Sequence, residues 1–312
     1  MLALVLATVS NAAFAIFIRL SQRRGANLTV VGAVNYVTAA LFHLVLTAAG
    51  HPQFPHWETI AIGGAGGITF SWAYFLLFDS MRRRGVSVTA SILGLSVMIP
   101  VGFSFLAWGE TTTLVQTAGI AIAIVSLPLL SIGPRAASSN QHKDSSGRSI
   151  LVLAGLFIVN GASLVTARAF HQTGIQNEDA VFLFIVFTSA TITTLLVWAA
   201  QELRRQRQAA QEPRAAGGQH RGAAAVADLP AVPLLASAVP GIAVGLCNAL
   251  SNRFIVLSLH TLPGIIVYPF YSAAGLLLTV AFSRIVWKEK ISRLEMAGIV
   301  LACSSIVLIN LV

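Results

Sequence analysis

The chain is a succession of long apolar runs separated by short polar clusters. Each run is close to the roughly 20 residues that an α-helix needs to cross a bilayer. Apolar residues follow one another in these runs without the alternation of a membrane β-strand, so the pattern favours helices. The predicted spans are residues 2–19, 29–49, 58–79, 86–108, 113–133, 149–170, 180–201, 231–257, 262–286 and 293–312. The sequence therefore predicts an all-α integral membrane protein with ten transmembrane helices.

Composition agrees with this pattern. The 312 residues are 56% hydrophobic and only 10% charged, whereas soluble domains carry about 25% charged residues. The first apolar run has no basic residue before it, so we expect it to remain as a helix rather than to be removed as a signal peptide. Neither cysteine belongs to a disulfide or metal-binding pattern.

Basic residues indicate the orientation in the membrane. Of the 20 Lys and Arg residues, all but Arg168 and Arg253 fall in the odd-numbered loops between the predicted spans. Basic loops face the cytoplasm, so the odd loops are predicted inside and both termini outside, in a bacterial inner (plasma) membrane. The net charge of +9 is then a topology signal that faces anionic lipid, and no nucleic-acid partner is expected.

The two halves of the chain repeat one another. Residues related by an offset of 149 include Asn11 and Asn160, Arg19 and Arg168, and Gly25 and Gly174. Residues related by an offset of 179 include Gly66 and Gly245, Gly85 and Gly264, Trp108 and Trp287, and Glu110 and Glu289. Because each half has five spans, an odd number, the second half must cross the membrane in the opposite orientation, as in transporters built from inverted repeats.

These offsets divide the chain. Residues 1–134 form the first repeat, residues 135–148 a cytoplasmic linker, and residues 149–312 the second repeat. The offset grows by 30 because residues 204–230 form an insertion, which is rich in Ala, Gln, Gly and Arg and is predicted to be disordered and cytoplasmic.

Several of the repeated motifs resemble those of a known family. They are Trp108-Gly109-Glu110 with Ala118-Gly119-Ile120, Trp287-Lys288-Glu289 with Ala297-Gly298-Ile299, and Pro100 upstream of Glu110. On these motifs the chain resembles the EamA-type transporters of the drug/metabolite transporter superfamily. The resemblance implies ten helices in two five-helix repeats and movement of small metabolites, often export of amino acids or related compounds. It also implies a structural role for Glu110 and Glu289, in capping or anchoring the turn between paired helices. The sequence departs from the repeat at Thr279, which replaces Pro100.

Neutral polar residues within the spans are the candidate substrate ligands. Asn11 and Asn160 occupy matching mid-span positions and can donate and accept hydrogen bonds. They are either a pair of ligands on the pseudo-twofold axis or hydrogen-bonding contacts between helices. Trp72, Tyr74, Tyr268 and Tyr271 could line an apolar cavity with polar tips, or could simply pack or face lipid.

Arg253, one turn beyond Asn248 and beside Asn252, is the main charged candidate. It could bind a substrate carboxylate, or extend to the outer membrane interface. Arg168 lies near Glu178 and Asp179, and a surface ion pair with one of them is expected. Each of two further spans, the third and the eighth, contains a GxxxG motif, Gly63 to Gly67 and Gly241 to Gly245, which allows close helix packing.

The function that fits these features is secondary transport of a small metabolite by alternating access between the repeats. All 11 acidic residues lie in loops or near span ends, which argues against exchange of protons for a cationic drug. No nucleotide-binding, zinc-protease or serine-hydrolase motif occurs, so we expect no enzyme activity and no cofactor or metal. The alternatives are a multidrug efflux protein and a non-transporting membrane scaffold or receptor. The sequence leaves open whether the protein forms a homodimer.

Overall fold

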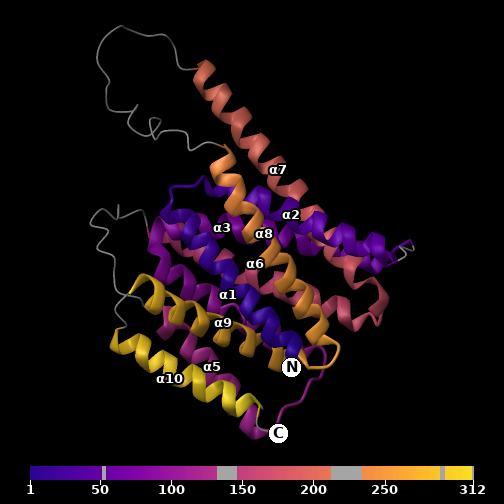
Figure 1. The fold of residues 1–312 in the computed structure, drawn as a ribbon, viewed down its shortest axis with the longest axis vertical. Coiled ribbons are helices and arrows are strands. Elements are labelled where there is room, and N and C mark those ends of the chain that lie inside the picture. Colours follow the sequence, from indigo (N-terminus) through magenta and orange to yellow (C-terminus); the bar gives the residue numbers. More distant parts are fainter. Residues whose placement is uncertain (51–53, 132–145, 212–233, 289–291, 311–312) are drawn as a thin grey trace.

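The computed structural model describes residues 1–50, 54–131, 146–211, 234–288 and 292–310. Over these residues the chain is helical and has no β-strand (Figure 1). The helices are α1 (Leu2–Arg23), α2 (Leu28–Ala49), α3 (Trp57–Leu95), α4 (Met98–Leu106), α5 (Leu114–Ser131), α6 (Ser146–Gln172), the 3-10 turn η1 (Gln176–Glu178), α7 (Asp179–Gln211), α8 (Leu234–Leu259), α9 (Gly264–Trp287) and α10 (Arg293–Asn310).

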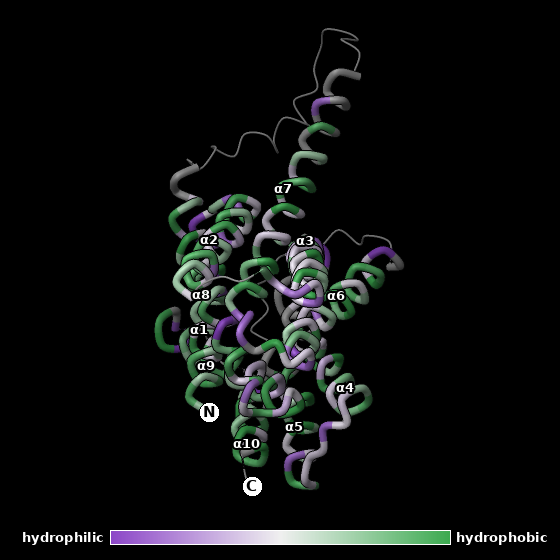
Figure 2. The backbone as a smooth tube through the Cα atoms, turned by 90° about the vertical axis from the view of Figure 1, so that its right-hand side faces the viewer, coloured by the Kyte–Doolittle hydropathy of each residue, from purple (hydrophilic) through white to green (hydrophobic). Residues whose placement is uncertain are grey.

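Seven helical segments in the described residues are long and apolar enough to cross a membrane. They lie in α1, α2, the first part of α3, α6, α7, α8 and α9, and three shorter apolar stretches cover residues 92–106, 114–127 and 296–309. Hydrophobic residues dominate along the helices (Figure 2). Large apolar side chains such as Leu41, Val45, Leu151 and Leu196 are exposed, as is typical of a surface that lipid covers. The chain is a multi-pass membrane protein.

The third and fourth predicted spans differ from the prediction at their junction. Helical backbone continues without a break through residues 57–95, where a connection between spans was expected after residue 79. The hydroxyl groups of Ser80 and Thr89 are nevertheless only 2.7 Å apart. Nine residues of straight helix would separate their Cα atoms by about 13 Å, too far for two short side chains to bridge. The chain therefore bends back on itself between these residues, and the polar contact secures the bend.

The only break in the predicted fourth span lies just upstream of Pro100. Helix α3 ends at Leu95, and α4 begins at Met98. Proline has no N–H to donate to the carbonyl of Ser96, and its ring would clash with that carbonyl in a continuous helix. In the first turn of α4 the missing donor is tolerated, because that turn has no intrahelical partners for its N–H groups. At Thr279, the equivalent position of the second half, α9 runs through without interruption.

Two predicted loop boundaries were wrong. Helix α7 continues to Gln211, so residues 204–211 of the predicted disordered insertion are helical. That stretch is composed of Arg, Gln and Ala, which have high helix propensity. Helix α6 begins at Ser146, three residues inside the predicted linker. The remainder of that linker up to residue 145, the insertion from residue 212, and Glu289 lie outside the described residues.

Both GxxxG motifs lie where two helices meet closely. A Cβ atom added at Gly67 of α3 would lie 2.2 Å from the backbone oxygen of Val186 in α7. A Cβ atom at Gly245 of α8 would lie 2.6 Å from Cβ of Thr38 in α2. Glycine is therefore required at both positions for the observed approach of the helices.

The helices pack mainly between the two halves of the chain. Helix α1 packs on α8 and α9, α2 on α7 and α8, and α3 on α6 and α7. Helix α4 packs on α6 and α9, and α5 lies beside α10 (Figure 1). Helix α1 begins and α10 finishes toward the same end of the bundle. This arrangement brings side chains from α3, α6, α7, α8 and α9 around one space.

Candidate functional site

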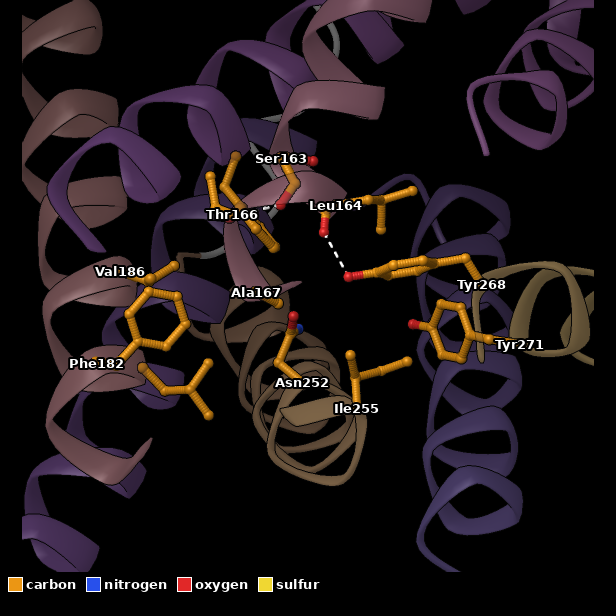
Figure 3. Close-up of a pocket in the computed structure, with 12 residues that line it drawn as sticks. Ser163, Leu164, Thr166, Ala167, Phe182, Val186, Asn252, Ile255, Tyr268 and Tyr271 are labelled. Carbon is orange, nitrogen blue, oxygen red and sulfur yellow. Dashed lines mark hydrogen bonds between the residues drawn. The ribbon is translucent and has the colours of Figure 1, made fainter. Parts of the chain in front are cut away.

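A cavity lies among α3, α6, α7, α8 and α9, so that helices from both halves contribute to it. It has about 390 Å³ of space free of protein atoms, counted out to its open mouth. The lining residues are Phe70, Ser163, Leu164, Thr166, Ala167, Phe182, Leu183, Val186, Asn252, Ile255, Tyr268 and Tyr271 (Figure 3). The wall is thus mostly apolar, with a few polar groups among aromatic rings.

Hydrogen bonds hold the polar groups of the wall in place. The Tyr268 hydroxyl donates to the Leu164 carbonyl at 2.8 Å, which joins α9 to α6 (Figure 3). The Tyr271 hydroxyl lies 2.9 Å from Oγ of Ser251, which joins α9 to α8. Asn252 points into the same space from α8.

A chain of three asparagines extends from the cavity into the protein. Nδ2 of Asn252 donates to Oδ1 of Asn248 at 2.8 Å, and Nδ2 of Asn248 donates to Oδ1 of Asn35 at 3.1 Å. Asn248 and Asn35 are buried. The chain crosses from α8 to α2, and it fixes the orientation of the Asn252 amide at the cavity wall.

Glu110 closes one end of this region. It follows Gly109, which adopts a left-handed conformation with φ of 62°. The Glu110 carboxylate accepts from the N–H groups of Gly264 (3.1 Å) and Ile265 (2.8 Å), the first residues of α9. These N–H groups have no partners within the helix, and the positive end of the helix dipole favours an anion there. The same carboxylate forms an ion pair with Arg168 of α6, and the two side chains are only 7% and 10% exposed.

Arg168 connects Glu110 to two further elements. Its Nη1 lies 2.9 Å from Nδ1 of His171, and it also approaches the carbonyl of Leu259 at the end of α8 (3.4 Å). A guanidinium can only donate hydrogen bonds, so Nδ1 of His171 is the acceptor and carries no proton. The prediction that Arg168 forms a surface ion pair with Glu178 or Asp179 was wrong: its carboxylate partner is buried and comes from the other half of the chain.

Asp179 and Glu178, two adjacent acids, complete the same end. Oδ2 of Asp179, at the start of α7, lies 2.8 Å from Nε2 of His260 and 3.5 Å from Nη1 of Arg253. Glu178 accepts hydrogen bonds from the backbone N–H of His56 and the hydroxyl of Thr59, and contacts the His56 ring at 2.6 Å. We call Glu110, Glu178 and Asp179, with the partners named above, the carboxylate seal.

The contact between His56 and Glu178 changes the pKa of both groups. Its hydrogen bond to Glu178 raises the pKa of His56 above the usual 6.5. Burial opposes ionisation of Glu178, but the hydrogen bonds from Thr59 and His56 outweigh it and lower its pKa below 4.5. The contact is therefore strongest where both groups are charged.

The carboxylate seal lies where the helices of the two halves meet. Residues 1–132 match the EamA-like transporter family. This match confirms the resemblance that the Trp108-Gly109-Glu110 motif and its neighbours indicated. A crystal structure of another protein superposes on 99% of this chain and 95% of its own, with a TM-score of 0.68 and 13% sequence identity, and so shows a shared fold. No curated protein is similar enough in sequence to count as a relative. The similarity to this family of transporters covers the first 132 residues of the chain.

Three of the candidate ligands line the cavity: Asn252, Tyr268 and Tyr271. Asn248 lies behind Asn252. Asn160 donates to Oγ of Ser96 at 2.6 Å, and Asn11 packs against Gly275, where an added Cβ would lie 2.9 Å from its Nδ2. Ser96 and Gly275 are themselves related by 179 residues. Both Asn residues thus make equivalent contacts between helices and lie outside the cavity lining.

The remaining candidates lie away from the cavity. Trp72 is half-exposed on α3, and the Tyr74 hydroxyl donates to the Leu28 carbonyl at 2.8 Å. Arg253 pairs with Asp179, which competes with any role as a carboxylate ligand. Among the motif residues, Trp108 lies beside the Phe103 ring, and Trp287 is the last residue of α9. Glu110 is a helix cap, but it caps α9 of the other half and not the turn between its own paired helices.

Sequence reasoning missed Ser163 and Thr166, the polar residues that α6 contributes. They follow Asn160 at spacings of three and six, which places all three near one face of the helix. That spacing of polar residues in an apolar helix was a usable signal. No sequence pattern could identify Phe70 and Phe182 as lining residues, because an apolar residue in a cavity wall resembles any other core residue in the sequence.

Proposed function

We propose that the protein is a secondary transporter that moves small amphipathic metabolites across the bacterial inner membrane by alternating access between two inverted five-helix repeats. The main observation behind this proposal is the cavity, which is formed by helices from both halves and lies beside the carboxylate seal. All ten predicted spans cross the bilayer in this proposal, and the fourth consists of the end of α3 together with α4. Helices α5 and α10, at 18 residues each, are near the shortest length that can span it.

Backbone geometry supports the two repeats. Four described residues have positive φ: Gly25 (69°), Gly174 (76°), Gly109 (62°) and Lys288 (52°). They form two pairs, at the offsets of 149 and 179 residues found in the sequence. Left-handed backbone is rare enough that two such coincidences support a duplicated fold.

The helix contacts support the same relation. Exchanging α1 with α6, α2 with α7, α3 with α8 and α4 with α9 converts the contact of α3 with α6 into that of α8 with α1. It likewise converts the contact of α2 with α8 into that of α7 with α3, and that of α1 with α9 into that of α6 with α4. The two GxxxG seams are one such pair. A pseudo-twofold axis through the space between the halves accounts for all of them.

The carboxylate seal supports alternating access. Its three acids link α3, α6, α7, α8 and α9 with the segment after α4, all at the end of the even-numbered loops. With basic loops inside, this end is external. The contacts hold the outer end together, and their release would open the cavity outward while the inner end closes. Export, rather than uptake, is proposed from the EamA-like resemblance.

The test is flux into sealed proteoliposomes that contain the purified protein, with labelled amino acids, amines and related metabolites, with and without a pH gradient. Saturable flux that disappears in Asn252→Leu and weakens in Tyr271→Phe would support the proposal. Leu196→Ala, on the lipid-exposed face of α7, is the matched control and should transport normally. Each variant must first elute as a single monodisperse species.

Two outcomes would favour other functions. Absence of flux from folded protein for every compound would favour a membrane scaffold or receptor. Flux driven by a pH gradient and competed by lipophilic cations would favour multidrug efflux. No described residue that lines the cavity is an acid, so no lining group can exchange a proton for a cation, which argues against coupling to a pH gradient.

A further inference from the structure

The side chains that line the cavity have already donated their polar hydrogens to the protein. The hydroxyl groups of Ser163 and Thr166 donate to the carbonyls of Asn160 and Ser163, each at 2.7 Å. The Tyr268 hydroxyl donates to the Leu164 carbonyl. Each of these hydroxyl groups has one hydrogen and two lone pairs, so each retains only acceptor capacity toward the cavity.

The amide hydrogens of Asn252 are likewise already donated within the protein. Its two amide hydrogens have two partners, the backbone carbonyl of Asn248 (3.0 Å) and Oδ1 of the same residue (2.8 Å). Asn248 in turn donates to Asn35, so Oδ1 of Asn248 must be an acceptor and the Asn252 amide cannot flip without losing both bonds. The group left to face the cavity is the carbonyl oxygen of Asn252 (Figure 3).

The role of Tyr271 follows from its neighbour. Oγ of Ser251 lies 3.1 Å from the carbonyl of Ala7, which can only accept. Ser251 has a single hydroxyl hydrogen and donates it there. In the 2.9 Å contact between the two hydroxyl groups, Tyr271 must therefore be the donor. Its oxygen, like that of Tyr268, retains only lone pairs for a ligand.

We infer that the cavity selects molecules with an apolar body and a head that donates hydrogen bonds, such as a hydroxyl, amine or amide N–H, and rejects molecules whose polar head only accepts, carboxylates above all. This inference rests on the proposed function and narrows its substrate class. The aromatic rings of Phe70, Phe182, Tyr268 and Tyr271 supply the apolar wall and also attract an ammonium group through their faces.

The nearby cations do not change this selection. Arg168 and Arg253 do not line the cavity, and they pair with the buried carboxylates Glu110 and Asp179. A ligand carboxylate would therefore enter a space in which every fixed polar group presents lone pairs. Buried groups that are built to bind an OH or NH reject analogues that lack it, because the protein acceptor is then left without a partner.

The experiment measures binding to the detergent-purified full chain by isothermal titration, with four probes that share one body: 3-phenylpropan-1-ol, 3-phenylpropylamine, 3-phenylpropyl methyl ether and 3-phenylpropanoate. The alcohol and the amine should bind at least roughly tenfold more tightly than the ether, the loss expected when one buried acceptor loses its donor. The carboxylate should bind most weakly of the four.

Variants test whether Asn252 carries the selection. Asn252→Leu should reduce the ratio of alcohol to ether affinity toward one. Leu196→Ala, outside the cavity on the exposed face of α7, should leave the ratio unchanged. Asn248→Leu, which removes one of the two acceptors of the Asn252 amide and leaves the backbone carbonyl in place, should lower the ratio by less than Asn252→Leu.

Three results would overturn the inference. Equal binding of ether and alcohol, or tightest binding of the carboxylate, would contradict it and leave the transport proposal standing. Absence of binding by all four probes to folded protein would show that this cavity is not the ligand site. The flux assay described above decides independently whether the protein transports.

Discussion

Glu110 and Arg168 form a buried ion pair that joins the two halves of the chain, and Glu110 at the same time caps α9. Glu110→Gln should leave the guanidinium buried without a carboxylate. Removal of one partner of a buried pair costs about 3–5 kcal/mol, and a loss of that order is expected in the free energy of unfolding measured in detergent.

Asp79→Asn is the matched control, because Asp79 pairs with Arg83 within one helix and is 42% exposed. Its effect should be no more than about 0.5 kcal/mol. Arg168→Gln combined with Glu110→Gln should recover part of the loss, since the double variant leaves no charge unpaired. Equal effects of the Glu110 and Asp79 variants would contradict the assignment.

The contact of His56 with Glu178 predicts a stability window in pH. The raised pKa of His56 adds stability that is complete below 6.5 and is lost as the pH rises through the folded-state value. The lowered pKa of Glu178 adds stability that is present above 4.5 and is lost as the pH falls through its folded-state value. The difference in melting temperature between the native protein and His56→Gln should be largest between these limits. A difference that does not vary from pH 4 to 8 would refute the contact.

Gly67 should tolerate no side chain. In Gly67→Ala the new methyl group would meet backbone atoms of α7, which cannot move aside as a flexible side chain would. Overpacking of this kind costs about 1–3 kcal/mol, and a lower melting temperature is expected. Gly102→Ala in α4 is the control, because nothing lies within 4 Å of its added Cβ. A Gly67 variant as stable as the Gly102 variant would show that α3 and α7 do not pack in this way.

The proposed topology is open to labelling in intact cells. In a background with Cys247→Ala and Cys303→Ala, a thiol introduced at Thr111 should react with a membrane-impermeant maleimide added outside. A thiol introduced at Arg24 should react only after the cells are opened, because basic loops face the cytoplasm. Reaction in the reverse order would invert the orientation and place the carboxylate seal inside.

Local sequence patterns predicted much of the fold. Length and hydropathy predicted the apolar helices. A connection between the third and fourth spans was predicted after residue 79, and the chain does bend there, between Ser80 and Thr89, although its backbone stays helical. Tyr74 illustrates the limit for the site. Like the tyrosines that line the cavity, Tyr74 lies in an apolar span. Its hydroxyl nevertheless donates to the Leu28 carbonyl, a partner that only the packing of α2 against α3 provides.

The ion pairs were the hardest feature to predict. Arg168 has two acids within 11 residues of it in the sequence, and it binds neither. It binds Glu110, which lies 58 residues away, because α4 packs against both α6 and α9. Chain proximity is a poor guide in a bundle whose main contacts connect separate halves.

The left-handed turn at Lys288 differs from its counterpart at Gly109 in one respect. Glycine adopts this conformation without steric penalty, but a residue with a Cβ atom is disfavoured there by about 1–2 kcal/mol. The first turn can therefore form on its own, whereas the second depends on its neighbours to hold it. The two turns share a backbone shape but not an intrinsic stability, so the two ends of the molecule need not unfold at the same temperature.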